Sequence, residues 1–172
     1  MPNTKSVGIA FSDPELTAGT TITGAVIDAT SRAASNIATG VQVSQQGATV
    51  ATTSNSDLFI IAPQAGTLTS ALFSGVDALT ASDTNYITFT ITNLGQAGAG
   101  SAAMLAATDP NTTKTTGGTA LVANSKRTLT LNGTAANLVV AAGDRLRCRA
   151  AATGTLANTV TFPVWQLTFS AL

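Results

Sequence analysis

The chain offers few side chains that could perform acid–base chemistry. It contains eight Asp and Glu residues and no His. The Ser-His-Asp and Cys-His arrangements and zinc sites that use imidazole are therefore excluded. Two carboxylates could still meet in space, as in a glycosidase or a small polysaccharide lyase, but nothing in the sequence indicates such a pair. We predict no catalytic residue and no enzymatic activity.

Metal and cofactor sites also lack a sequence signal. Asp77 and Asp83 flank one loop and could help to bind a hard cation, but calcium takes about six to eight oxygen ligands and no dense Asp/Asn motif is present. We expect both to be turn-forming or strand-flanking residues. The run 95–100 is glycine-rich but matches neither the dinucleotide fingerprint nor the Walker loop, and it predicts a flexible loop. We predict no metal and no cofactor.

Basic residues form the one chemical cluster that the sequence suggests. Arg145, Arg147 and Arg149 alternate along a strand-like segment, so they share one face and form a short cationic stripe. Lys126 and Arg127 form a second basic cluster. Arginine is enriched at protein interfaces, where it pairs with carboxylates of a partner or a neighbouring subunit. We predict that these five residues are interface residues; an ordinary solvated face is the alternative.

The overall charge argues against nucleic acid and membranes as partners. Eight Lys and Arg balance eight Asp and Glu, and charged residues make up only 9% of the chain. No global field is available to hold a polyanion or an anionic lipid surface. No apolar window approaches the ~20 residues that cross a bilayer, and the apolar stretch 7–11 is too short for a secretory signal. We expect a protein that is soluble where it is made.

Alternating apolar residues predict the strands that position these side chains. In Tyr86–Thr92, every second residue is Ile or Phe, which indicates a strand with one buried side. Leu146 and Cys148 alternate with the arginines, so we expect Cys148 to be a small buried apolar residue. Further strand candidates are 67–73, 128–131, 137–141 and 158–169. Short strands separated by turn residues favour a sandwich or a barrel.

Two segments are irregular. The apolar parity of the last strand changes at Pro163, which has no N–H for the ladder. We therefore expect a bulge or an edge position near Pro163, which would let both halves bury their apolar residues. Trp165 should then lie in the core. The Ala-rich segment 101–107 is the one plausible helix, and we place it in a loop because it is too short to be stable alone.

The density of bulky residues changes along the chain. Residues 1–55 carry only isolated aliphatic residues, whereas apolar runs begin at Leu58. We predict an extended, Ser/Thr/Ala-rich N-terminal arm, or loosely paired strands, over residues 1–55. Residues 56–172 should form the β-sandwich domain.

Three stretches resemble known β-sandwich proteins. The segment LVVAAGDRLR (138–147), followed by VTFPVWQL (160–167), resembles the end of jelly-roll domains such as the tumour-necrosis-factor and complement-type trimers. The segment IAPQAGTLTS (61–70) is similar to the opening strand of β-sandwich proteins on tailed-bacteriophage virions, which include capsid decoration proteins and head-fibre knobs. The resemblance implies an all-β, jelly-roll-like antiparallel β-sandwich.

The same resemblance implies a function without catalysis. It suggests a virion surface protein, often a homotrimer, that is made in the host cytoplasm, binds the major capsid protein on the outer capsid surface and stabilises the shell. The alternative is a receptor- or carbohydrate-binding knob of a phage head or tail fibre. Both are expectations, because one fold hosts many functions.

Overall fold

Short strands separated by turns build the part of the chain that the structure describes. A computed structural model describes residues 41–171. Its strands are β1 (Val41–Gln46), β2 (Ser56–Ile61), β3 (Gly66–Ser74), β4 (Tyr86–Asn93), β5 (Ala102–Ala103), β6 (Arg127–Thr128), β7 (Val139–Val140), β8 (Arg145–Thr153) and β9 (Val164–Ala171). Short 3-10 turns occupy Asp109–Asn111 and Ala135–Leu138. Between residues 41 and 171, no helix is long and apolar enough to cross a membrane.

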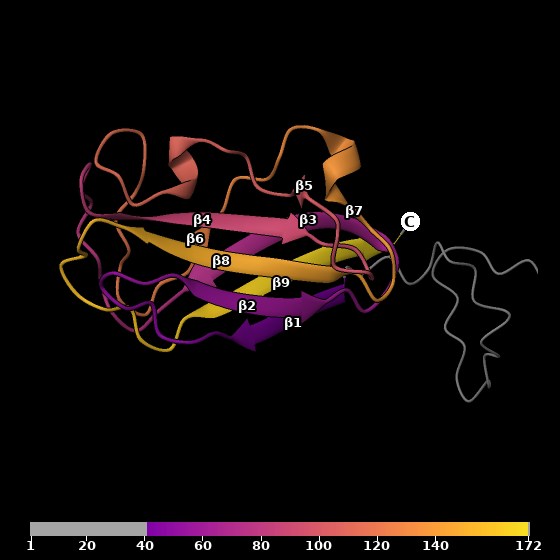
Figure 1. Cartoon of the computed structure of the whole chain (residues 1–172), viewed down its shortest axis with the longest axis horizontal. Coiled ribbons are helices and arrows are strands. Elements are labelled where there is room, and N and C mark those ends of the chain that lie inside the picture. The colour runs from indigo at the N-terminus through magenta and orange to yellow at the C-terminus, as the bar shows by residue number, and fades with distance from the viewer. Residues whose placement is uncertain (1–40, 172) are drawn as a thin grey trace, which may run out of the picture. The chain divides into compact units, whose positions relative to one another are not determined.

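The strands pair in a nested antiparallel order. β1 pairs with β9, β2 with β8, β3 with β7, and β4 with β5. Successive pairs alternate between two sheets, with strand orders β1-β9-β3-β6 and β2-β8-β4-β5, and Figure 1 shows the two sheets facing each other. An antiparallel ribbon wrapped in this way is a jelly roll. The predicted all-β, jelly-roll-like sandwich is confirmed.

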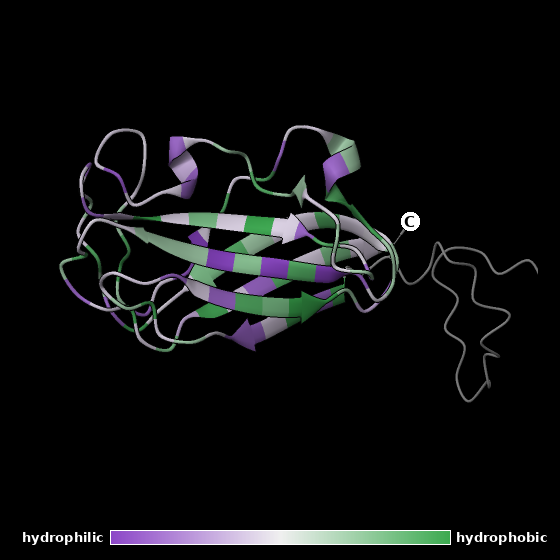
Figure 2. Cartoon of the chain, in the orientation of Figure 1, coloured by the Kyte–Doolittle hydropathy of each residue, from purple (hydrophilic) through white to green (hydrophobic). Residues whose placement is uncertain are grey.

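The core lies between the sheets and is filled from one parity of each strand. Figure 2 shows the resulting alternation of hydrophilic and hydrophobic residues along β8. Phe73, Phe89 and Trp165 meet at its centre, with ring centroids 4.6 to 6.0 Å apart. Such aromatic pairs each add about 0.5–1.5 kcal/mol beyond the area that they bury. Trp165 and Cys148 are fully buried, as predicted.

The sandwich begins before the predicted boundary at residue 56. β1 pairs with β9 along its whole length, and Val50 is buried and bridges Val160. β1 is an edge strand that packs only Val43 against the core, so its sparse aliphatic residues are sufficient for its position. Residues 1–40, where the rest of the predicted N-terminal arm falls, lie outside the described residues.

Residues 101–107 form no helix and lie mostly in a loop, as predicted, apart from one very short strand. Ala102 and Ala103 form β5 beside the end of β4, and the amide of Met104 donates to the carbonyl of Ile91 at 2.8 Å. Met104 and Leu105 are both buried in the core. Burial of consecutive large apolar side chains under the sheets outweighs the modest helix propensity of three or four alanines.

The predicted irregularity before the last strand is present at Phe162. This residue has a φ of +48°, which turns the chain between the Val160 bridge and the start of β9 at Val164. Val160 and Trp165 both point into the core, although they differ in parity. Phe162 itself is 62% exposed, so the turn buries the ends of the segment and leaves its middle outside.

Candidate functional site

The outer face of the sheet formed by β2, β8 and β4 carries all three arginines of the predicted stripe. We call it the arginine face. Leu146, Cys148 and Ala150 fill the core, so the residues between them on β8 point outward. The strand register sets three rows across this face: Asp57–Arg149–Thr90, Phe59–Arg147–Thr92 and Ile61–Arg145. The predicted cationic stripe is therefore confirmed as one face of one strand.

Arg149 is neutralised by its neighbour on β2. Its Nε and Nη2 donate to the two carboxylate oxygens of Asp57 at 2.6 and 2.7 Å. This fork-to-fork geometry is the strongest arrangement of an arginine with a carboxylate. The hydrogen bonds from Arg149 hold the pKa of Asp57 below its ordinary value. Because each side chain is about one-third exposed, the pair stabilises the fold only weakly.

Arg147 has no such partner. It lies between Phe59 on β2 and Thr92 on β4. Among residues 41–171, no carboxylate lies within ion-pair distance of it, and its buried Nε has no hydrogen-bond partner. An arginine side chain has five N–H donors, so Arg147 is a positive charge with uncommitted donors in the middle of the face.

Arg145 lies at the end of the stripe beside exposed apolar residues. Its guanidinium stacks on the ring of Phe59, with 5.5 Å between the guanidinium carbon and the ring centroid. Phe59 and Ile61 are 44% and 54% exposed on β2, which is an edge strand of its sheet. We call Phe59, Ile61 and Arg145 the β2 patch. Aromatic residues and arginine beside an unpaired strand edge are typical of a protein-binding surface.

A groove of about 520 Å³ lies on the arginine face, on the side of Arg147 toward β4. Its floor carries hydroxyl and guanidinium groups from β4 and β8: Thr88, Thr90, Thr92, Arg147 and Arg149. Its wall is the segment 103–114, which begins at the last residue of β5. Tyr86 and Lys114 also line the groove. The groove is therefore open to solvent, with polar groups on its floor and apolar residues such as Leu105, Ala106 and Ala107 along its wall.

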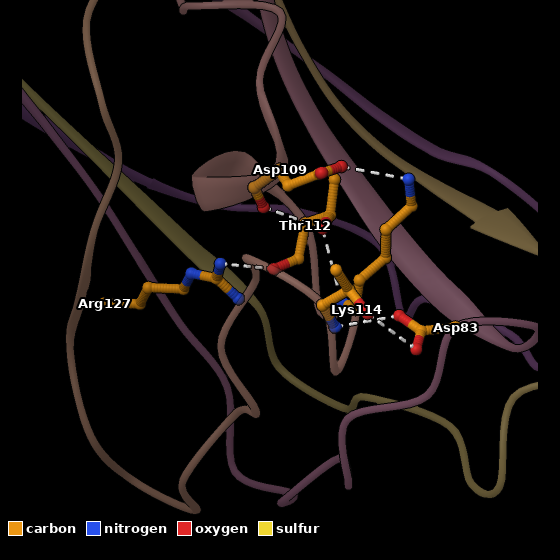
Figure 3. Close-up of polar contacts among 6 residues, drawn as sticks. Asp83, Asp109, Thr112, Lys114 and Arg127 are labelled. Carbon is orange, nitrogen blue, oxygen red and sulfur yellow. Dashed lines mark hydrogen bonds and ion pairs between the residues drawn. The ribbon is translucent and has the colours of Figure 1, made fainter.

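Polar contacts hold the wall of the groove in place (Figure 3). Lys114 donates to Asp109 at 2.9 Å, which raises the pKa of the lysine, and its ammonium lies 5.0 Å from the ring centroid of Tyr86. Asp83 accepts hydrogen bonds from the amide and hydroxyl of Thr116. The charge of Lys114 is thus neutralised by a carboxylate of the same loop.

The prediction of an interface role for Arg127 is wrong. Its side chain lies against residues 110–119, which include the end of the groove wall, and donates to the carbonyls of Thr119, Pro110 and Thr112 at 2.5 to 2.7 Å. The residue is only 9% exposed, and burial lowers the pKa of its guanidinium. The three carbonyls hold the guanidinium within the loop, and those of Pro110 and Thr119 have no other donor among residues 41–171, so most of the side chain is withdrawn from the surface.

Lys126 is exposed but belongs to a different surface. It precedes β6, which lies in the sheet opposite the arginine face. The structure therefore brings together Arg145, Arg147 and Arg149 and separates them from Lys126 and Arg127.

Sequence reasoning missed Asp57, Phe59 and Ile61 as residues of this face. Their signal was present in the alternation with Leu58 and Ile60, which marks them as outward-facing on β2. The groove wall carried no comparable signal, because its position depends on contacts between loops.

The remaining candidate residues have structural roles. Asp77 accepts hydrogen bonds from the amide and hydroxyl of Thr161, so Asp77 and Asp83 both tie loops together as expected. In the described range, no group of three His, Cys, Asp or Glu side chains could hold a metal ion. Burial raises the pKa of the Cys148 thiol to about 12, which keeps it protonated and unreactive.

No protein-family model, curated protein or solved structure matches this chain. The arginine face, with its β2 patch and its groove, is the candidate functional site on geometric grounds alone.

Proposed function

We propose that the protein is a non-enzymatic structural protein of a virion, a bacteriophage capsid decoration protein. It binds the major capsid protein on the outer surface of the capsid and stabilises the shell. The β2 patch is the observation that carries this proposal. It combines a stacked Phe–Arg pair, an exposed Ile and a strand edge that no other strand in residues 41–171 pairs with.

The β2 patch supports binding to a protein surface for two physical reasons. The free edge of β2 can add to a strand of a partner through main-chain hydrogen bonds. Covering Phe59 and Ile61 would remove apolar surface from water, at about 25 cal/mol per Å². Because both side chains are only half exposed, the two together would strengthen binding roughly tenfold to a hundredfold.

Capsid binding can be tested directly with expanded capsids assembled without the protein. We expect the wild-type protein to sediment with these capsids and to increase their resistance to heat. A double variant with Phe59→Ser and Ile61→Ser should bind at least about tenfold more weakly. Val122→Ser is the matched control, because Val122 is also an exposed apolar residue but precedes β6 in the opposite sheet. Equal heat resistance with and without the protein, or equal binding of the double variant, would contradict the proposal.

A homotrimer is the assembly that we propose for the free protein. Light scattering at low and high concentration should then give a mass three times the 17.1 kDa of one chain. A monomeric mass at every concentration would refute the trimer in solution.

A further inference from the structure

We propose that the groove on the arginine face binds a carboxylate-bearing saccharide, with Arg147 as the residue that holds the carboxylate. This inference goes beyond capsid decoration and does not depend on it. It rests on three features of the groove: its charge, its hydroxyl-bearing floor and the pairing of the strands beneath it.

The groove contains one positive charge, that of Arg147, that an anionic ligand could neutralise. Arg149 is paired with Asp57, and Lys114 is paired with Asp109, so both charges are already neutralised. Arg147 lines the groove and has no carboxylate partner among residues 41–171. A single carboxylate would give its guanidinium a planar two-oxygen partner, which is the geometry that arginine binds best.

The groove floor suits a ligand with many hydroxyl groups. Thr88, Thr90 and Thr92 present hydroxyl groups in a row along β4. The register places Thr92 beside Arg147 and Thr90 beside Arg149. Each hydroxyl can both donate and accept a hydrogen bond, which matches the hydroxyl groups of a sugar ring. The volume of about 520 Å³ lies within the range of small-molecule sites.

The pairing of the strands argues against a peptide in the groove. β8 is paired on both sides, by β2 and β4. β4 is paired by β8 on one side, and on the other by β5 and by a bridge from Thr88 to Thr112. A peptide that binds a sheet usually adds to a long unpaired edge, and within residues 41–171 each strand of the floor has partners on both sides. The floor offers side-chain groups only, which favours a saccharide.

The test compares matched saccharides on the full-length protein. Titration calorimetry and two-dimensional NMR would use a panel of oligosaccharides that contain uronate or sialate, each beside its neutral counterpart. We expect millimolar or tighter binding of at least one acidic member, with shifts at Thr88, Thr90 and Thr92. The neutral counterpart should bind at least about tenfold more weakly, and the acidic affinity should fall as salt is raised.

Two arginine variants separate the groove from the rest of the stripe. Arg147→Gln should weaken binding of the acidic saccharide roughly tenfold to a hundredfold, because a charge-assisted pair is lost. Arg145→Gln is the control, since Arg145 lies on the same strand face but outside the groove lining. Unchanged NMR spectra away from the substitution would show that each variant is folded.

Four outcomes would overturn the inference. These are an absence of binding across the acidic panel, equal affinity for neutral and acidic members, equal losses in the two variants, and tighter binding of a glutamate-rich peptide. The last would assign the groove to a protein ligand. A capsid-binding defect in the β2 patch variants would leave the result for the groove unchanged.

Discussion

Replacing Arg127 with Met should destabilise the fold, although Arg127 belongs to neither the β2 patch nor the groove. The guanidinium donates to three loop carbonyls and lies over the ring of Phe89, 5.1 Å from its centroid. Methionine keeps an apolar stem of similar length but has no donor. Residues 110–119 would therefore lose the hydrogen bonds that hold them against Arg127.

The expected loss in the free energy of unfolding follows from the number of carbonyls that Arg127→Met leaves without a donor. The carbonyl of Thr112 keeps the amide of Thr119 as a donor, at 3.1 Å. The carbonyls of Pro110 and Thr119 lose the guanidinium, and because both are only partly buried, each costs about 1 kcal/mol, the lower end of the range for an unsatisfied acceptor. Water can reach part of the loop, and removal of a buried charge offsets some of the loss. We expect a decrease of about 2 kcal/mol in the free energy of unfolding, or roughly 5–10 °C in Tm.

Urea unfolding followed by tryptophan fluorescence measures this change. Trp165 is the one tryptophan of the chain and is fully buried, so its emission reports loss of the core. Lys126→Met is the matched control and should change stability by no more than about 0.5 kcal/mol, because Lys126 is exposed. Arg127→Lys should recover only part of the loss, since an ammonium cannot reach three carbonyls as the planar fork does. The reasoning is refuted if Arg127→Met costs no more than Lys126→Met.

Three further predictions concern other parts of the sandwich. Gly154 has a φ of +67°, and a Cβ there would collide with the loop before β4, so Gly154→Ala should cost about 1–3 kcal/mol. Gly133→Ala, where a Cβ meets nothing within 4 Å, should be nearly neutral; equal urea midpoints for the two variants would contradict the clash. The ion pair with Arg149 lowers the pKa of Asp57 below its ordinary 3.8 in the folded state, so its contribution of about 0.5 kcal/mol is present above that pH. The contribution disappears as the pH falls through the lowered pKa, and Asp57→Asn should flatten the stability profile between pH 5 and about pH 2; parallel profiles would count against the pair. Cys148 should resist thiol reagents at pH 8 and react rapidly in urea, because burial raises its pKa to about 12; labelling of the folded protein at the rate of a free thiol would disprove its burial.

The sequence predicts the strands whose alternation is complete. β4 and β8 alternate large apolar residues with polar ones, so both their burial and the outward direction of the arginines could be read in advance. The start of the sandwich could not, because β1 is an edge strand that packs only Val43 against the core and resembles the preceding Ser/Thr-rich region. Periodicity detects a strand by the residues that it buries, and an edge strand buries few.

The candidate site was predictable only where it lies on one strand. The stripe on β8 is local, whereas Asp57 and Arg149 are 92 residues apart and meet through strand pairing. The burial of Arg127 could not be predicted from the sequence either. Its neighbour Lys126 is exposed, and only hydrogen bonds to the carbonyls of the preceding loop keep Arg127 buried. The sequence supplies the residue types, and the fold decides which of them share a surface.

The nested strand order has a consequence for how the protein is made. β9 lies between β1 and β3, so the middle strand of one sheet leaves the ribosome after all the strands that surround it. At ~5–20 residues per second, β1 waits on the order of ten seconds for its partner. Contacts between segments so distant in sequence form slowly, because a long loop must close first. The nascent chain therefore cannot complete this sheet before β9 emerges from the ribosome.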